Sequence, residues 1–227
     1  MLTFHLITLF PEACEAYINA SILGRARKNK KMTVKYQNPR DFVTNKWGKV
    51  DERPYGGGPG MVMTALPVAK AVQKSIGKIS GLTKSRHASK GRKVAIVWFS
   101  PGRKAFDNKE ADKLASFDDV VLVCGRYEGI DERAKKILKT LGTLKTYAVG
   151  EAVYTGGEIP AMALVDAVTR RLPGVLGKDE SVEERRVASG EVYTRPEVIV
   201  FNKKRYTVPS VLLTGHAAKI EEWRKKK

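Results

Sequence analysis

The sequence predicts an α/β fold built on a mostly parallel sheet. Short apolar runs with strand character alternate along the chain with stretches of helical periodicity. Most of these runs are largely apolar, as in strands of a sheet that helices cover on both faces. Several of them stop at a loop that carries glycines, the pattern of α/β proteins that bind ligands beyond the carboxyl ends of their strands.

The predicted elements follow one another in regular order. The first is an alternating apolar run at 2–9, which we interpret as a strand rather than a signal peptide because it lacks a basic leader and a small-residue cleavage site. A helix is expected after Pro11. The remaining strands are expected at 32–37, 93–99, 119–124 and 144–149. The remaining helices are expected at 64–76, 107–116, 130–140 and 160–172.

The character of the chain changes after Leu176. Residues 177–189 are charged and hold few apolar anchors, which is typical of a linker. Residues 190–227 predict a small, mainly helical domain that ends in an amphipathic helix. We therefore expect a main domain over 1–176, a linker over 177–189 and a carboxyl-terminal domain over 190–227.

The charge balance indicates a polyanionic partner. The chain has 42 Lys+Arg against 24 Asp+Glu, a formal net charge of +18. Such an excess attracts polyanions, and nucleic acid fits it better than a membrane, because no basic amphipathic helix with an aromatic face stands out. The alternative is a charge that serves solubility alone. The two cysteines, Cys14 and Cys124, are interpreted as reduced, buried residues of a cytoplasmic protein.

Three strand-end loops, at 98–102, 124–129 and 149–158, predict one small-molecule pocket. Their backbone amides suit an adenine edge, and apolar side chains beside them suit the faces of the ring. A Rossmann-type oxidoreductase is excluded, because the sequence lacks GxGxxG and its downstream acidic residue. The glycines of PYGGGPG at 54–60 allow either a tight turn or close approach of a ligand.

Long motifs in these regions are similar to those of a known family. The sequence resembles the bacterial tRNA (guanine-N1)-methyltransferases of the SPOUT class. The matching segments cover nearly the whole chain, in order: LITLFPE (6–12), VDERPYGGGPGMVM (50–63), SPGR (100–103), CGRYEGIDER (124–133), TGGEIPAM (155–162), DAVTRRLPGVLG (166–177), YTRPE (193–197) and VPSVLLTGHAAKIEEWR (208–224).

The resemblance implies a homodimer with a SPOUT-type trefoil knot, although knots are almost absent from protein folds. It also implies S-adenosylmethionine as methyl donor, Mg²⁺ as an auxiliary ion, and methyl transfer to N1 of the guanosine immediately 3′ of the anticodon in tRNA. No acidic cluster has a spacing diagnostic of Mg²⁺. By motif, the donor site comprises Trp98, Phe99, Ser100, Pro101, Gly125, Tyr127, Glu128, Val149, Gly150, Glu151, Ala152, Val153, Tyr154, Gly156, Gly157 and Pro160.

The chemistry calls for a base near N1 of guanine, which carries a proton at neutral pH, and a cation near O6. The resemblance assigns the cation to Arg170. At the position of the family's aspartate base this chain has Arg185, and an arginine cannot be the base. Three alternatives follow. Glu184, which we favour, or Glu183 is the base; an acid elsewhere serves, such as Asp166; or the chain is a non-catalytic or weakly active tRNA-binding protein on the same fold.

The basic residues predict where tRNA binds. We expect contacts with the insert at 77–93 and with the carboxyl-terminal unit at Arg195, Lys203, Lys204 and Arg205, together with the terminal lysines. Contacts of this kind, made with phosphate, supply affinity but little sequence discrimination.

Overall fold

The computed structural model describes residues 1–77, 92–176 and 191–225. The chain forms two compact units, Met1–Val175 and Leu176–Lys227. The linker expected at 177–189 lies outside the described residues, as does nearly all of the basic insert at 77–93. Among the helices that the structure describes, none combines the length and the apolar character that a bilayer crossing requires.

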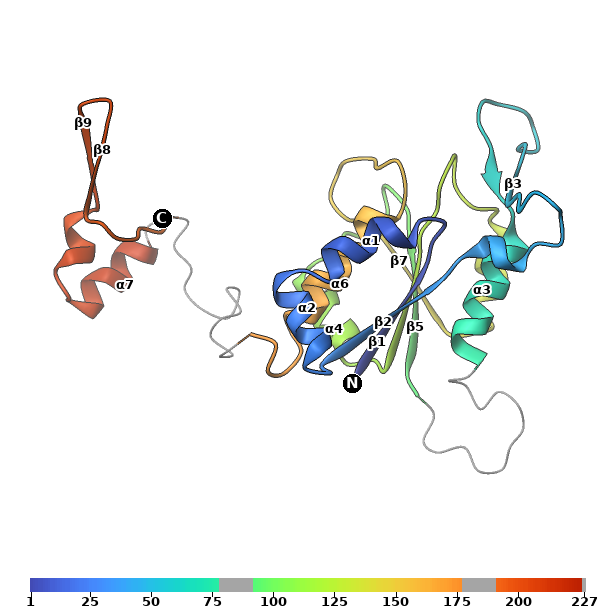
Figure 1. Cartoon of the computed structure of the whole chain (residues 1–227), viewed down its shortest axis with the longest axis horizontal. Coiled ribbons are helices and arrows are strands. Elements are labelled where there is room, and N and C mark those ends of the chain that lie inside the picture. Colours follow the sequence, from blue (N-terminus) through green and yellow to red (C-terminus); the bar gives the residue numbers. More distant parts are fainter. Residues whose placement is uncertain (78–91, 177–190, 226–227) are drawn as a thin grey trace. The chain divides into compact units, whose positions relative to one another are not determined.

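A five-stranded sheet forms the centre of the first unit (Figure 1). Its strands lie in the order β2-β1-β6-β5-β7, and every neighbouring pair is parallel. This confirms the α/β fold with a parallel sheet. The strands are β1 (Leu2–Ile7), β2 (Met32–Gln37), β5 (Val94–Phe99), β6 (Asp119–Val123) and β7 (Thr143–Tyr147).

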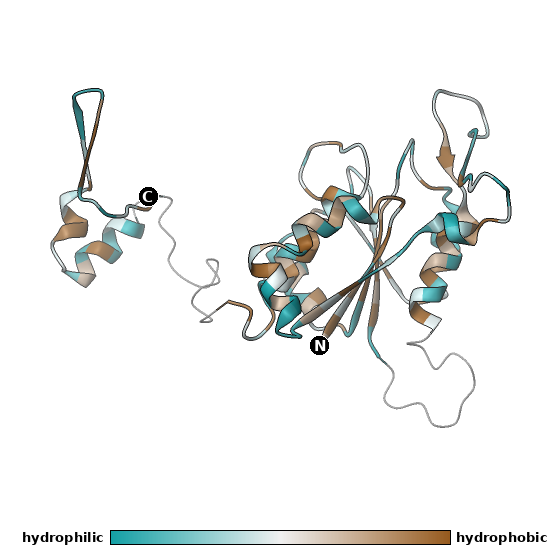
Figure 2. Ribbon diagram, in the orientation of Figure 1, coloured by the Kyte–Doolittle hydropathy of each residue, from teal (hydrophilic) through white to brown (hydrophobic). Residues whose placement is uncertain are grey.

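Helices cover both faces of this sheet (Figure 1). One apolar core joins the sheet to α1 (Pro11–Ile18), α2 (Ser21–Lys28), α4 (Asn108–Ala115) and α6 (Glu158–Thr169). A second core, on the opposite face, joins it to α3 (Ala65–Gly77) and α5 (Arg133–Leu138). The central strands are hydrophobic over most of their length (Figure 2), because each contributes side chains to both cores.

Alternation along a strand divides the side chains between the two cores. On β6, Val120 and Leu122 belong to the core under α6, whereas Val121 and Val123 belong to the core under α3. Successive residues of a strand point to opposite faces. The residue at which a strand ends therefore determines which face of the sheet its last side chain lies on.

Two short elements lie outside the sheet in the first unit. The 3-10 helix η1 (Pro39–Phe42) begins after Asn38, whose side chain accepts a hydrogen bond from the amide of Arg40. The strands β3 (Asp51–Glu52) and β4 (Val62–Met63) form an antiparallel pair. They flank the glycine-rich segment 54–60.

The second unit contains a β-hairpin beside its helices. The antiparallel strands β8 (Val198–Phe201) and β9 (Lys204–Thr207) are followed by the 3-10 helix η4 (Ser210–Leu213) and by α7 (Ala217–Lys225). The sequence pattern predicts a mainly helical unit and does not predict the hairpin. The missed signal is the two-residue connection, since Asn202 and Lys203 both have positive φ angles, as in the turns that favour hairpins.

Candidate functional site

A cavity of about 270 Å³ opens at the carboxyl ends of β6, β5 and β7. These strands are neighbours in a parallel sheet, so the loops that leave them meet at one edge. The volume is close to the lower end of the roughly 300–1,000 Å³ typical of small-molecule sites. The cavity is lined by Phe99, Ser100, Pro101, Gly125, Arg126, Tyr127, Glu128, Gly129, Tyr147, Ala148, Val149, Gly150, Ala152, Val153, Tyr154, Thr155, Gly156, Gly157 and Pro160.

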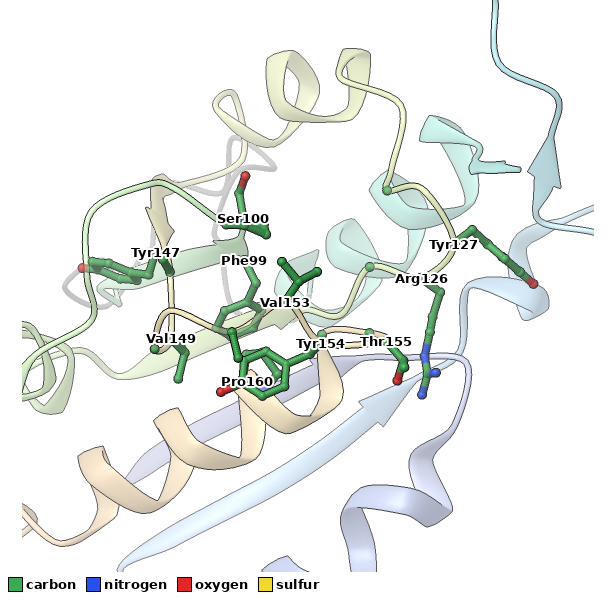
Figure 3. Close-up of a pocket in the computed structure, with 18 of the residues that line it drawn as sticks. Phe99, Ser100, Arg126, Tyr127, Tyr147, Val149, Val153, Tyr154, Thr155 and Pro160 are labelled. Carbon is green, nitrogen blue, oxygen red and sulfur yellow. The ribbon is translucent and has the colours of Figure 1, made fainter. Parts of the chain in front are cut away.

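Apolar side chains gather on one side of the cavity. Figure 3 shows Phe99, Val153, Tyr154 and Pro160 close to one another, from the end of β5, the loop after β7 and the first turn of α6. Val153 and Tyr154 are exposed at the rim, with 78 % and 37 % of their surface accessible. A flat aromatic ligand such as a purine fits a wall of this kind.

Two glycines bring the chain before α6 against the loop after β6. The amide of Gly157 donates a hydrogen bond of 2.8 Å to the carbonyl of Gly125, and Gly156 forms an antiparallel bridge with Arg126. A Cβ atom on Gly157 would lie 2.6 Å from Cα of Cys124, so only glycine fits there. This main-chain contact forms the floor between two loops that line the cavity.

The loop after β6 is held in an unusual conformation. Tyr127 has φ 60°, in the left-handed region that costs a residue with a side chain about 1–3 kcal/mol. The segment that includes β4 holds it there: the carbonyl of Met61 accepts a hydrogen bond from the amide of Glu128, and the amide of Met63 donates to Gly129. The sequence between PYGGGPG and α3 thus packs on the wall of the cavity.

A buried carboxylate anchors the end of β7. The Tyr147 hydroxyl, which points away from the cavity in Figure 3, donates to Oε2 of Glu110. The ammonium groups of Lys104 and Lys113 lie 2.6 and 2.7 Å from Oε1 of Glu110. Hydrogen bonds from Lys104, Lys113 and Tyr147 lower the pKa of Glu110 to about 2. Burial and the bond to Glu110 raise the pKa of Tyr147.

Most of the donor-site residues named from the sequence line this one cavity, and two do not. Trp98 is buried in the core on the α3 face, with Lys135 Nζ 4.8 Å from its ring centroid. Because neighbouring residues of a strand face opposite ways, Phe99 and not Trp98 faces the cavity. Glu151 is exposed and lies outside the lining.

Five lining residues were not named from the sequence: Arg126, Gly129, Tyr147, Ala148 and Thr155. Arg126, Gly129 and Thr155 lie within loops that the sequence indicates as part of the pocket. The bounds of those loops are therefore enough to predict that these residues line it. Tyr147 and Ala148 lie at the end of β7, which the structure ends earlier than the expected strand at 144–149.

The residues expected to be catalytic are not brought to the cavity. Arg170 follows α6 as its half-buried carboxyl-terminal cap and does not line the cavity. At 1.5 Å per residue along a helix, it lies about 15 Å beyond Pro160. Asp166 accepts a hydrogen bond of 2.7 Å from the Tyr17 hydroxyl, away from the cavity lining. The glutamates at 183 and 184, and Arg185, lie outside the described residues.

No metal centre is evident in the parts of the chain that were described. Across 1–77, 92–176 and 191–225, no three His, Cys, Asp or Glu residues group closely enough to hold a metal ion. Cys14 and Cys124 are free and buried. Burial, and secondarily the charge of Glu158, raises the pKa of Cys14 to about 11 and that of Cys124 well above its ordinary value.

The parallel sheet, its strand-end cavity and the glycine crossing at its floor define an α/β protein with a site for a nucleoside-size ligand. Comparison with known proteins gives the family. The model of the family tRNA (Guanine-1)-methyltransferase TrmD matches residues 2–227. The chain belongs to this family, and it is accordingly a tRNA (guanine-N1)-methyltransferase whose methyl donor is S-adenosylmethionine.

Individual relatives agree with this assignment. The chain is 42 % identical over 224 residues to the tRNA (guanine-N(1)-)-methyltransferase of Haemophilus influenzae, covering 97 % of this chain and 83 % of the relative. It is 41 % identical over 225 residues to the enzyme of the same name from Mannheimia succiniciproducens, with coverages of 97 % and 81 %. For the one from Pectobacterium atrosepticum the identity is 40 % over 224 residues, with coverages of 97 % and 82 %.

Proposed function

We propose that the cavity at the ends of β6, β5 and β7 holds S-adenosylmethionine, and that the protein methylates N1 of the guanosine immediately 3′ of the anticodon in tRNA. The observation that carries the proposal is the joining of three separate strand-end loops around one cavity. These are the loops that the family motifs SPGR, CGRYEG and TGGEIPAM occupy.

The residues present fit an adenosine group. Phe99, Val149, Tyr154 and Pro160 supply apolar surface for the two faces of a purine, and the main chain of the glycine-bearing loops approaches without side chains in the way. The donor carries its methyl on a sulfonium and needs little further activation. The role of the protein is to hold this group in line with the guanine, which removes much of the entropic barrier.

The chemistry on the guanine requires two further groups. We assign Arg170 to the charge that develops at O6, and Glu184 to removal of the proton at N1. Arg170 lies about 15 Å along α6 from Pro160, so its own chain does not bring it to this cavity. Mg²⁺ remains part of the proposal only as an auxiliary ion.

A homodimer would complete such a site. Exposed apolar side chains at and near the rim of the cavity support a covering partner, namely those of Phe10, Val153, Tyr154 and Ile159. Removal of a cluster of this kind from water is favourable. Sedimentation equilibrium is expected to give twice the mass of the chain, and a monomer at micromolar concentration would contradict the dimer.

The close crossing of the chain supports the trefoil knot of the SPOUT class. Residues 155–157 pass directly against 124–126, with the bond from Gly157 to Gly125 at their centre. Main chain packed this closely against main chain fits a segment threaded through a loop, and glycine permits the approach.

Two measurements test the function. Calorimetric titration with S-adenosylmethionine is expected to show saturable binding. Incubation with unmodified tRNA transcripts is expected to methylate those with guanosine 3′ of the anticodon, with inosine at that position as a comparison for the role of the base's amino group. Binding of tRNA without any methyl transfer would favour a non-catalytic RNA-binding protein, and absence of donor binding would contradict the site.

A further inference from the structure

Glu158 is a buried carboxylate that touches two of the segments around the cavity. It is the first residue of α6 and only 3 % exposed. Its Oε1 accepts a hydrogen bond of 2.7 Å from the hydroxyl of Thr8, which follows β1. Its Oε2 lies 2.9 Å from Nε of Arg126, in the loop after β6. One side chain thus ties together three parts of the chain that are distant in sequence.

The arginine of this pair is itself held on two sides. The guanidinium of Arg126 lies over the ring of Phe10, with 4.6 Å between Cζ and the ring centroid. The amide of Phe10 in turn donates 3.0 Å to the hydroxyl of Thr8, so the loop after β1 belongs to the same cluster. Gly156 leaves room for the arginine, since a Cβ there would lie 2.6 Å from Arg126 Cδ.

This ion pair spans the two walls of the cavity. Arg126 lies between Gly125 and Tyr127, which line one wall, and Glu158 lies between Gly157 and Pro160, which line the other. The carboxylate of Glu158 is buried, with 4 % of its side chain exposed, whereas the side chain of Arg126 is 26 % exposed. A buried carboxylate that loses its cation is costly, so the two walls are strongly coupled through this contact.

We propose that Glu158 is a positioning residue for the donor site, which fixes the loop Gly125–Gly129 against the start of α6 through Arg126. The inference rests on the proposed function, because it assigns the cavity to S-adenosylmethionine. Glu158 acts through Arg126 and not by touching the methyl donor, since its own side chain does not line the cavity.

The molecule provides a matched control at the other end of the same sheet. Asp119, at the start of β6, is fully buried and pairs with one arginine, Arg92, at 2.7 Å. Its Oδ1 also lies 2.9 Å from Nε2 of His5, and Glu158 likewise has a second polar partner, the hydroxyl of Thr8 at 2.7 Å. Both are therefore buried carboxylates paired with a partly exposed arginine, and only one of them is beside the cavity.

The experiment compares Glu158→Gln with Asp119→Asn in the full-length protein. Both substitutions are expected to lower the melting temperature. Only Glu158→Gln is expected to weaken S-adenosylmethionine binding, by about tenfold in calorimetric Kd, and to raise KM for the donor without changing Kd for tRNA. The variant Thr8→Val keeps the ion pair but removes one restraint on it, and it is expected to show the same change at a smaller size should Glu158→Gln not fold.

The outcomes separate the two claims. Failure of the wild-type protein to bind the donor would overturn the proposed function. Normal binding by the wild type together with unchanged donor Kd in Glu158→Gln and Thr8→Val would overturn the positioning role alone. An equal loss of donor affinity in Asp119→Asn would also overturn it, since the effect would then follow stability and not the contact with Arg126.

Discussion

Gly157 and Cys124 approach so closely that a side chain cannot be placed between them. A Cβ atom on Gly157 would lie 2.6 Å from Cα of Cys124 and 2.9 Å from the amide nitrogen of Gly125. Gly157 has φ −79°, which any residue can adopt, so the reason for glycine here is space and not conformation. Both obstructing atoms belong to the main chain at the end of β6 and cannot turn aside as a side chain would.

Gly157→Ala is therefore expected to damage both stability and donor binding. Forced separation of the two segments should cost about 1–3 kcal/mol of unfolding free energy, the usual range for overpacking, and raise the donor Kd at least about tenfold. Urea denaturation and calorimetry measure the two effects. Gly77→Ala is the control, because no atom lies within 4 Å of its Cβ position. Unchanged donor affinity in Gly157→Ala would show that the crossing does not shape the site.

Glu110 is expected to make the stability of the first unit depend on acid pH. Its pKa is lowered from 4.5 to about 2 in the folded protein. A carboxylate with a lowered pKa stabilises the fold fully above its unfolded pKa, and this contribution disappears as the pH falls from 4.5 towards 2. Glu110→Gln should remove an amount on the order of 3 kcal/mol at neutral pH, since the pKa falls from 4.5 to about 2 and each pKa unit corresponds to about 1.4 kcal/mol.

Unfolding by urea at several pH values from 6 to 3 measures this difference. Wild type and Glu110→Gln should converge in stability as the pH falls. Glu132→Gln is the matched control, since Glu132 pairs with Lys135 at 2.6 Å but is exposed, and exposed pairs contribute little. A constant gap between wild type and Glu110→Gln across this range would contradict the prediction.

The sheet could be predicted from the sequence because its strands are short apolar runs that stop at turn-forming residues. The strand expected at 32–37 has the observed bounds, and those expected around β1, β5, β6 and β7 differ from them only at their ends. Helix α2 was missed. Its sequence, SILGRARK, has four polar or charged residues among eight and a glycine, so its helical pattern is weak.

The sequence predicts which loops form the site, but not the contacts between residues of different loops. Strand ends that carry glycines can be recognised in a sequence, because the tight turns there require glycine locally. The pairing of Glu158 with Arg126, and the support of Tyr127 by Met61, join residues far apart along the chain. No local pattern encodes such contacts. The position of Trp98 outside the cavity can be predicted from the alternation of side chains along β5, once Phe99 is known to be the last residue of that strand.

Glu184→Gln is expected to lower single-turnover methylation by about 100-fold or more, the usual scale for a positioned base. The reason is chemical: the resemblance places Arg185 where the family's aspartate base is expected, and an arginine cannot accept a proton. Glu183→Gln is the neighbouring control and should keep most of the activity. Rapid quenching with excess enzyme over tRNA isolates the chemical step. Normal activity in Glu184→Gln would direct the search to Glu183 or to Asp166.

The hairpin β8–β9 is expected to carry part of the salt-sensitive binding of tRNA. Lys203, Lys204 and Arg205 follow one another at its turn and the start of β9, all exposed, and the hairpin has no acidic residue. Each phosphate contact contributes about 0.7–0.9 to the slope of log K against log salt. Replacing all three residues by glutamine should therefore reduce that slope by about 2–3, as measured by filter binding over a range of salt concentrations.

The control replaces three exposed lysines of the first unit that lie outside the expected tRNA surface, namely Lys28, Lys30 and Lys109. Glutamine at these positions removes the same charge and should leave the slope nearly unchanged. Equal slopes for the two triple variants would show that the hairpin responds only to net charge and makes no phosphate contacts of its own.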